Sequence, residues 1–307
     1  MNKLKGKDLI SLNLLSSEEI QLILDETEKL KTGPRNTEFL KGKTLAMIFE
    51  KSSTRTRVSF ETGIYQLGGM GMFFSPKDLQ MGRGETIHDT AKVLSRYVDG
   101  IMARTFSYQT VLDLAKYASV PVINGLTDYD HPCQILADLY TIYEKRGKLK
   151  GLTLTYIGDG NNVLHSLIQG CVKVGMNICY ASPEGYKPLQ SVIDEALEVA
   201  KVTGSTIKQF NSAAEAVKDT DVIYTDVWVS MGQESDEAKK LKDLKEFQLN
   251  SELMKKAKSD VLVMHCLPAH RGQEITDDIV DGPNSIVFDE AENRLHAQKA
   301  VMKLLMS

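Results

Sequence analysis

The chain of 307 residues is long enough for about two domains of roughly 100–200 residues each, which excludes peptide-sized and single-motif proteins. With 42% hydrophobic and 25% charged residues, its composition lies near the average of soluble globular proteins and excludes collagen-like, disordered and low-complexity chains. The formal net charge of −4 provides no basic field for nucleic acid or an anionic membrane, so any anion has to be bound by a local cluster of cations.

The four cysteines, Cys133, Cys171, Cys179 and Cys266, form no C-x-x-C pair and are too sparse for a disulfide framework. Charged and polar residues interrupt the opening segment before an apolar run reaches the length of a signal peptide. No stretch approaches the roughly 18 consecutive apolar residues of a membrane span. We therefore expect a cytoplasmic protein that binds neither a membrane nor nucleic acid.

Short apolar, β-rich runs alternate with segments of helical period, which predicts an α/β fold of two domains, each a mostly parallel sheet flanked by helices. A first helix begins at a capping box of Ser16 and Glu19 and ends at Gly33. The other elements predicted for the first half are strands at Thr44–Phe49, Gly71–Phe74, Gly100–Ala103 and Val120–Asn124, and helices at Val58–Leu67, Thr86–Tyr97 and Tyr108–Ala118.

The segment from Pro132 to Arg146 predicts a single helix that connects the domains, because proline favours its first turn and Gly147 follows its end. We expect residues 1–147 to form the first domain and 148–290 the second, with 291–307 returning as a C-terminal helix that packs on the first. The elements predicted for the second half are strands at Leu152–Ile157, Ile178–Ala181, Asp221–Tyr224, Val261–His265 and Ile286–Phe288, and helices at Val163–Val174, Leu189–Val202, Glu252–Lys258 and Ala291–Leu305.

The strongest local signal is the run Ser53-Thr54-Arg55-Thr56-Arg57, which lies between a predicted strand and a predicted helix. A helix N-terminus offers unpaired N–H groups and a partial positive charge, and hydroxyl and guanidinium groups beside it make a compact phosphate site. Arg55 and Arg57 cannot face the same way on a helix, whereas Arg57 can pair with Glu61. We assign Arg55 to the anion and expect Arg57 to act indirectly. The alternative is that the hydroxyls only cap the helix and both arginines are solvated.

His131 and Gln134 form a second candidate pair, at the start of the connecting helix. A spacing of three residues in a first helical turn places both side chains on one face, where they can hydrogen-bond a carbonyl oxygen or a phosphate. A histidine that only stabilises the turn is the alternative.

Two further segments follow predicted strands, one from Thr225 to Gly232 and one from Met264 to Gly272. Parallel sheets bind ligands at the carboxyl ends of their strands, so Cys266 is well placed for a site and Asp226 can hold an ammonium group beside it. Two histidines near Cys266 also suggest a zinc site. The sequence has no second Cys or His pair at the spacing of a zinc site, so we predict no metal. A buried cysteine and an ordinary loop are the alternatives.

The turn Gly158-Asp159-Gly160 follows a strand and opens a helix, as a dinucleotide fingerprint does. The third glycine of that fingerprint is replaced by Val163, which disfavours NAD. We interpret the segment as a tight turn between strand and helix, and predict no cofactor.

Together these motifs resemble the aspartate/ornithine carbamoyltransferase superfamily over essentially the whole chain. Ser53-Thr54-Arg55-Thr56-Arg57 is similar to its carbamoyl phosphate signature, and His131-Pro132-Cys133-Gln134 to another part of that site. Ser230-Met231-Gly232 and His265-Cys266-Leu267-Pro268 resemble the ornithine branch rather than the aspartate branch. Further matches are Arg104, Asn162, Asp226 and Glu292-Asn293-Arg294.

The resemblance implies transfer of the carbamoyl group of carbamoyl phosphate to the δ-amine of L-ornithine, which gives L-citrulline and phosphate. It also implies a role in arginine biosynthesis and a reaction without a covalent enzyme intermediate. The catalytic residues that it implies are Arg55, Arg104, His131, Asp226 and Cys266. It implies binding of carbamoyl phosphate by Ser53, Thr54, Arg55, Thr56, Gln80, Arg104, His131, Gln134, Cys266, Leu267 and Arg294, and of ornithine by Asn162, Asp226, Ser230 and Met231.

The segment from Ser75 to Glu85 has no helical or strand period, which is typical of a mobile functional loop. The resemblance implies a homotrimer, or a multiple of trimers, in which this loop carries Gln80 into the neighbouring subunit's carbamoyl phosphate site.

Two other interpretations stay open. In the first, the acceptor is a modified ornithine, putrescine or aspartate, although the presence of Ser230-Met231-Gly232 argues against these acceptors. In the second, the chain is a non-catalytic subunit. A non-catalytic subunit is expected to lose an arginine of the site or the pair of His131 and Gln134, and this sequence keeps them all.

Overall fold

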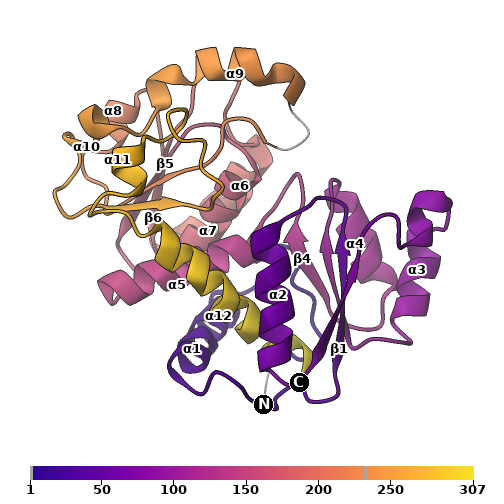
Figure 1. The fold of residues 1–307 in the computed structure, drawn as a ribbon. Coiled ribbons are helices and arrows are strands. Elements are labelled where there is room, and N and C mark those ends of the chain that lie inside the picture. The colour runs from indigo at the N-terminus through magenta and orange to yellow at the C-terminus, as the bar shows by residue number, and fades with distance from the viewer. Residues whose placement is uncertain (1–2, 231–233) are drawn as a thin grey trace. The chain divides into compact units, whose positions relative to one another are not determined.

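A computed structural model of the chain describes residues 3–230 and 234–307. Its contacts define two compact units, one of Met1–Tyr140 with Glu292–Ser307 and one of Thr141–Ala291. The chain leaves the first unit within α5 (Pro132–Arg146) and returns to it within α12 (Val287–Met306). The predicted fold class is confirmed, since each unit is a parallel sheet with helices (Figure 1). The domain boundary between 147 and 148 stays a prediction.

The first unit contains a four-stranded parallel sheet in the order β2-β1-β3-β4. Strand β1 occupies the interior of the sheet and is almost wholly buried, which explains its unbroken apolar run. The strands are β1 (Thr44–Phe49), β2 (Met70–Phe74), β3 (Gly100–Arg104) and β4 (Val122–Leu126), and the helices are α1 (Ser17–Thr32), α2 (Thr54–Gln66), α3 (Ile87–Leu94) and α4 (Tyr108–Tyr117), with short 3₁₀ turns η1 (Leu12–Leu14) and η2 (Gln80–Arg83).

Local sequence signals determine where the helices of this unit begin. The capping box is confirmed, because the Ser16 hydroxyl accepts a hydrogen bond from the Glu19 N–H while the Glu19 carboxylate accepts one from the Ser16 N–H. Ser53 caps α2 in the same manner, through the N–H of Thr56. Helix α2 therefore starts directly after the turn that follows β1, which sets the run of hydroxyls and arginines at its N-terminus.

The last helix, α12, belongs to the first unit from Glu292 onward. Its side chain Asn293 accepts a hydrogen bond from Lys31 at 2.8 Å, and Lys299 donates one to Gln66 at 3.0 Å. These contacts tie α12 to α1 and α2, as expected for a C-terminal segment that returns to the first domain. The helix begins a few residues earlier than predicted.

The second unit contains a five-stranded parallel sheet in the order β7-β6-β5-β8-β9. Its order reverses between β5 and β8, because the chain proceeds from β5 outward through β6 and β7 and then returns to the other side of β5. The strands are β5 (Thr153–Ile157), β6 (Asn177–Ala181), β7 (Ile207–Phe210), β8 (Val222–Thr225) and β9 (Leu262–His265), and the helices are α6 (Asn162–Lys173), α7 (Gln190–Thr203), α8 (Ala213–Ala216), α9 (Glu237–Asp243), α10 (Ser251–Met254) and α11 (Asp277–Val280), with 3₁₀ turns η3 (Glu234–Asp236) and η4 (Lys245–Phe247).

Two predictions for this unit are wrong in detail. The strand at Ile286–Phe288 is absent, because Ile286 makes only a single backbone hydrogen bond to Val263 before α12 begins, and Asp289 and Glu290 favour the first turn of that helix. Strand β7 was not predicted, since two polar residues occupy its centre, as an edge position permits. Across 3–230 and 234–307, no helix is long and apolar enough to cross a membrane.

Candidate active site

The first unit gathers the predicted anion-binding residues around the N-terminus of α2. Thr56 is fully buried in the first turn of this helix, and its hydroxyl accepts hydrogen bonds from Ser53 at 3.1 Å and from Arg294 at 3.2 Å. Arg294 comes from α12, far along the chain, and also donates to the side-chain oxygen of Gln134. Two helices distant in sequence therefore converge on the start of α2.

The convergence extends to Arg104 and His131. Burial, followed by the positive charges of Arg294, Arg104 and Arg55, holds the pKa of His131 well below its ordinary value. His131 is therefore a neutral imidazole near pH 7, in the electrostatic field of three guanidinium groups. Arg104 ends β3 and is only 5% exposed, so it faces the interior of the unit and not bulk solvent.

Arg57 is directed elsewhere, as predicted. Its Nε donates to Glu61 at 3.0 Å, and its guanidinium lies 3.8 Å from the centre of the Phe73 ring. Thr54 and Arg55 lie with Ser53 and Thr56 at the helix start, whereas Gln80 is exposed at the start of η2. The structure thus brings the arginines, His131 and Gln134 together within one chain, and leaves Gln80 on the surface of this unit.

Cys133 lies between His131 and Gln134 in the sequence, but its thiol is buried and hydrogen-bonds the backbone. Its Sγ donates to the carbonyl oxygen of Asn124 at 3.3 Å, and burial raises its pKa to about 12. We therefore treat Cys133 as a packing residue.

In the second unit, the predicted residues that the structure describes follow the carboxyl ends of β5, β8 and β9, and the strand order reverses between β5 and β8. Asp226 follows β8 and is 5% exposed. One of its carboxylate oxygens accepts from Asn161 at 2.7 Å, and the other accepts from the Cys266 thiol at 3.0 Å. The predicted neighbour relation of Asp226 and Cys266 is confirmed.

Asn161, which the sequence did not single out as a binding residue, contacts Asp226. It caps α6, since its side-chain oxygen accepts from the N–H of Val163 at 3.0 Å, while its amide nitrogen reaches Asp226. Asn162, predicted instead, is the first residue of α6. The signal was present, because asparagine directly before a helical segment is a preferred cap. Ser230 is half-buried, whereas Met231 and Gly232 lie outside the described residues.

His265 supports the loop after β9. It is fully buried, its Nε2 lies 2.9 Å from a carboxylate oxygen of Glu274, and its Nδ1 accepts from the N–H of Leu267 at 2.9 Å. Leu267 has a φ of 56°, which is uncommon for a residue other than glycine, and its N–H is held in place by this bond. The imidazole therefore orients the backbone beside Cys266.

Ligand atoms of Asp226, His265 and Cys266 lie within 4.8 Å of one another, a spacing that a metal ion can bridge. Both ring nitrogens of His265 already take part in hydrogen bonds, so metal binding there requires one of them to break. The geometry therefore favours hydrogen bonding over coordination.

The glycine turn after β5 is filled by the chain itself. Gly160 donates its N–H to the carbonyl oxygen of Tyr186 at 2.8 Å, and a Cβ on Gly160 would lie 2.5 Å from backbone atoms of Lys187 and Pro188. Backbone of the loop after β6 thus packs directly against Gly160 and leaves no room for a side chain there.

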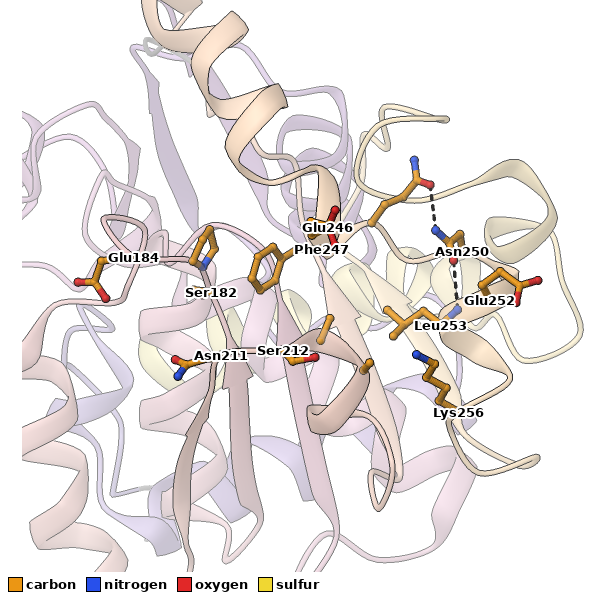
Figure 2. A pocket seen from close by; sticks show the side chains of 14 residues that line it. Ser182, Glu184, Asn211, Ser212, Glu246, Phe247, Asn250, Glu252, Leu253 and Lys256 are labelled. Carbon is orange, nitrogen blue, oxygen red and sulfur yellow. Dashed lines mark hydrogen bonds between the residues drawn. The ribbon is translucent and has the colours of Figure 1, made fainter.

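A cavity of about 710 Å³ lies elsewhere in the second unit, at the ends of β6 and β7 (Figure 2). Asn250 in its wall donates to Gln248 at 3.1 Å and accepts from the N–H of Leu253 at 3.1 Å, so these amides stabilise the wall (Figure 2). None of the described residues predicted to bind substrate lines this cavity. The cavity is therefore separate from Asp226 and Cys266, which lie where the strand order reverses.

A cluster of arginines around a neutral imidazole, in a chain that also carries a carboxylate and thiol pair at strand ends, is typical of a group-transfer enzyme with an anionic donor. Comparison with known families agrees. The carbamoyl-P binding domain of aspartate/ornithine carbamoyltransferase matches residues 7–144, and the Asp/Orn binding domain matches 150–305. The chain belongs to the aspartate/ornithine carbamoyltransferase family.

Individual relatives match over almost the full length. The ornithine carbamoyltransferase of Thermococcus kodakarensis is 57% identical over 306 residues, covering 99% of this chain and 97% of the relative. That of Bacillus subtilis is also 57% identical, covering 99% and 95%. The solved structure of ornithine carbamoyltransferase from Pyrococcus furiosus is 54% identical, with a TM-score of 0.96 and coverage of 99% of this chain and 98% of that chain.

Proposed function

We propose that the chain catalyses transfer of the carbamoyl group from carbamoyl phosphate to the δ-amine of L-ornithine, giving L-citrulline and phosphate. The observation that carries the proposal is that Arg294 joins Gln134 to Thr56 at the start of α2, with a neutral His131 in the field of Arg55, Arg104 and Arg294. This arrangement suits an anionic donor with a carbonyl group. Full-length similarity to relatives that are named ornithine carbamoyltransferases supports the acceptor.

In the first unit, the phosphate group is bound by the start of α2 and by guanidinium groups. Backbone N–H groups and hydroxyls at the start of α2 hydrogen-bond phosphate oxygens, and the arginines balance the charge of the leaving phosphate. The residues assigned to this role are Ser53, Thr54, Arg55, Thr56, Arg104 and Arg294, joined by Gln80 from a neighbouring copy.

The carbonyl oxygen of carbamoyl phosphate becomes negative when the amine adds to the carbon. A neutral His131 donates a hydrogen bond to this oxygen without titrating near pH 7, and Gln134 and Arg104 add further donors. The tetrahedral intermediate then expels phosphate, so no enzyme side chain has to form a covalent bond.

The second unit holds the acceptor. Asp226 and Cys266 orient the amines of ornithine, Asn162, Ser230 and Met231 bind its amino-acid end, and Leu267 and Cys266 also contact carbamoyl phosphate. An alkylammonium with a pKa near ~10.4 is not a nucleophile, so the enzyme uses the free amine and its rate rises with pH above neutrality.

A citrulline assay tests the proposal. Carbamoyl phosphate is supplied with ornithine, putrescine or aspartate in parallel, and the carbamoylated product is measured by colour and by mass. Product from ornithine at a rate well above those from the other acceptors supports the proposal. Product from another acceptor alone, or from none, contradicts it.

We further propose that the active enzyme is a homotrimer or a multiple of trimers, in which Gln80 completes the neighbouring copy's donor site. Large apolar side chains lie exposed on α2 and on the edge strand β2, namely Val58, Tyr65, Met70 and Met72. Covering such side chains with a second copy is favourable, and an edge strand is otherwise open to uncontrolled pairing.

Mixing two defective variants tests this arrangement. Arg55→Ala and Gln80→Ala trimers are dissociated reversibly and reassembled together, which creates sites with both native residues. Activity should exceed the sum for the two variants treated separately. Mixing Arg55→Ala with Arg104→Ala is the matched control, because those residues come from one chain and no intact site forms. Absence of recovery, with subunit exchange confirmed by mass, rejects the shared site.

We also propose that the enzyme works in the cytoplasm and in arginine biosynthesis. All four cysteines are free thiols and three are buried, which suits a reducing compartment. A relative from Pyrococcus furiosus that is 54% identical is named an anabolic ornithine carbamoyltransferase, which supports the biosynthetic direction.

A further inference from the structure

A buried ion pair joins helix α9 to the turn between β5 and α6. The Lys240 ammonium lies 2.5 Å from a carboxylate oxygen of Asp159, and each residue is only 7% exposed. Asp159 lies two residues before Asn161, whose amide holds Asp226. The ion pair is therefore directly connected to the acceptor half of the site.

The same turn makes two further contacts with neighbouring segments, and one of those segments also contacts α9. The Gly160 N–H donates to the carbonyl oxygen of Tyr186 at 2.8 Å, and the Tyr186 hydroxyl in turn donates to Asp243 of α9 at 2.9 Å. Trp228, which follows Asp226, packs over Gly158, where a Cβ would lie 3.5 Å from its indole ring. The turn thus contacts the loop after β6 and the segment after β8, and both the turn and the loop after β6 contact α9.

A buried ion pair contributes little net stability, because removing two charges from water costs about as much as their attraction returns. Loss of one partner is costly, since the other charge then stays buried without compensation. Burial raises the pKa of Asp159, and the Lys240 ammonium opposes that rise, so each group depends on the other. Such a pair is better suited to fixing one arrangement of two segments than to stabilising the fold.

We propose that Lys240 is a positioning residue for the acceptor half of the site. Through Asp159 it fixes the turn that carries Asn161 and that packs against Trp228. This inference rests on the proposed function only for the identity of the acceptor. Lys239 and Lys242 of the same helix are exposed and have no such role.

Trp228 is the only tryptophan of the chain and is 3% exposed, so its fluorescence reports the position of this segment independently of catalysis. In Lys240→Met, the emission should move to longer wavelength and quenching by acrylamide should increase, at a temperature where far-ultraviolet circular dichroism is unchanged. Lys242→Met, the matched control on the same helix, should match wild type, and Lys240→Arg should lie between them.

Steady-state kinetics supply the second readout. Positional coupling of this kind is worth about 0.5–2 kcal/mol, so Lys240→Met should raise the KM for ornithine roughly 2- to 30-fold while the KM for carbamoyl phosphate stays unchanged. The double variant Lys240→Met with Asp159→Asn removes the unpaired buried charge. It should recover thermal stability without recovering the ornithine KM, because the link between α9 and the turn is still absent.

The inference is overturned if folded Lys240→Met keeps native Trp228 quenching and native ornithine KM. It is also overturned if the double variant recovers ornithine KM together with stability, since the pair would then act on the fold alone. A wild-type enzyme that carbamoylates a different acceptor would contradict the proposed function instead, and the Trp228 measurements would still decide the role of Lys240.

Discussion

Replacing Asp226 with asparagine tests the acceptor half of the site with minimal change in shape. The carboxylate accepts one hydrogen bond from Asn161 at 2.7 Å and another from Cys266 at 3.0 Å. An amide has a single acceptor oxygen, so one of these two donors loses its partner. The attraction for a substrate ammonium or amine is lost as well. A hydrogen bond to a charged group contributes about 1.5–3 kcal/mol, which corresponds to a loss of roughly 10- to 150-fold in kcat/KM for ornithine.

The assay follows citrulline formation with ornithine varied at saturating carbamoyl phosphate, and calorimetry measures carbamoyl phosphate binding to the free enzyme. Asp226→Asn should leave the binding of carbamoyl phosphate within about two-fold of wild type, because Asp226 is assigned to ornithine alone. The two measurements therefore separate an effect on the acceptor from an effect on both substrates. Asp194→Asn is the matched control, since Asp194 is exposed on α7 and bonds only Gln190 among the hydrogen bonds described. Equal losses for both substrates, or a loss below about three-fold in kcat/KM, refute the assigned role.

Three further outcomes are expected. Arg55→Ala should lower kcat/KM more than about 100-fold with the fold intact. Arg57→Ala should lower it less, because the guanidinium of Arg57 pairs with Glu61. Near-normal turnover of Arg55→Ala would contradict the site. The pKa of His131 is lowered in the folded state, so its contribution to the free energy of unfolding is present above about pH 6.5 and falls by up to about 1.4 kcal/mol per pH unit below it. In denaturant titrations from about pH 5 to 7, the free energy of unfolding of His131→Asn should therefore depend less on pH than that of wild type. Identical slopes against pH would disprove this linkage. Buried Cys133 should stay unmodified by iodoacetamide at pH 8 in mass spectra of the native protein, and its alkylation before unfolding would show that its environment is wrong.

Much of the fold follows from local signals in the sequence. Alternation of β-rich and helical runs predicted parallel sheets, and the bounds of β1 and α5 agree with the predicted Thr44–Phe49 and Pro132–Arg146. Capping chemistry and turn residues act over a few positions, which is why the capping box of Ser16 and Glu19 is readable without any knowledge of packing. Ser53–Arg57, Asp226 and Cys266 were found because each follows a predicted strand, whereas Arg104, Asn162 and Arg294 were expected only from the family resemblance.

Short elements depend on neighbours distant in sequence. Ile286-Val287-Phe288 has strand propensity, but these residues belong to the approach and first turn of α12. Strand β7 has few apolar residues and exists because β6 provides a free edge for pairing. In both cases tertiary contacts outweigh a propensity of less than about 1 kcal/mol.

The sequence by itself determined the class of fold, the run of hydroxyls and arginines at the start of α2, and the position of Asp226 and Cys266 after strands. Only the tertiary structure decided which side chains meet. Arg294 joins Thr56 and Gln134 across a separation of more than a hundred residues, Asn161 contacts Asp226, and Lys240 pairs with Asp159. These partners lie close because burial of charge and backbone packing select them, and neither effect leaves a periodic signal in the chain.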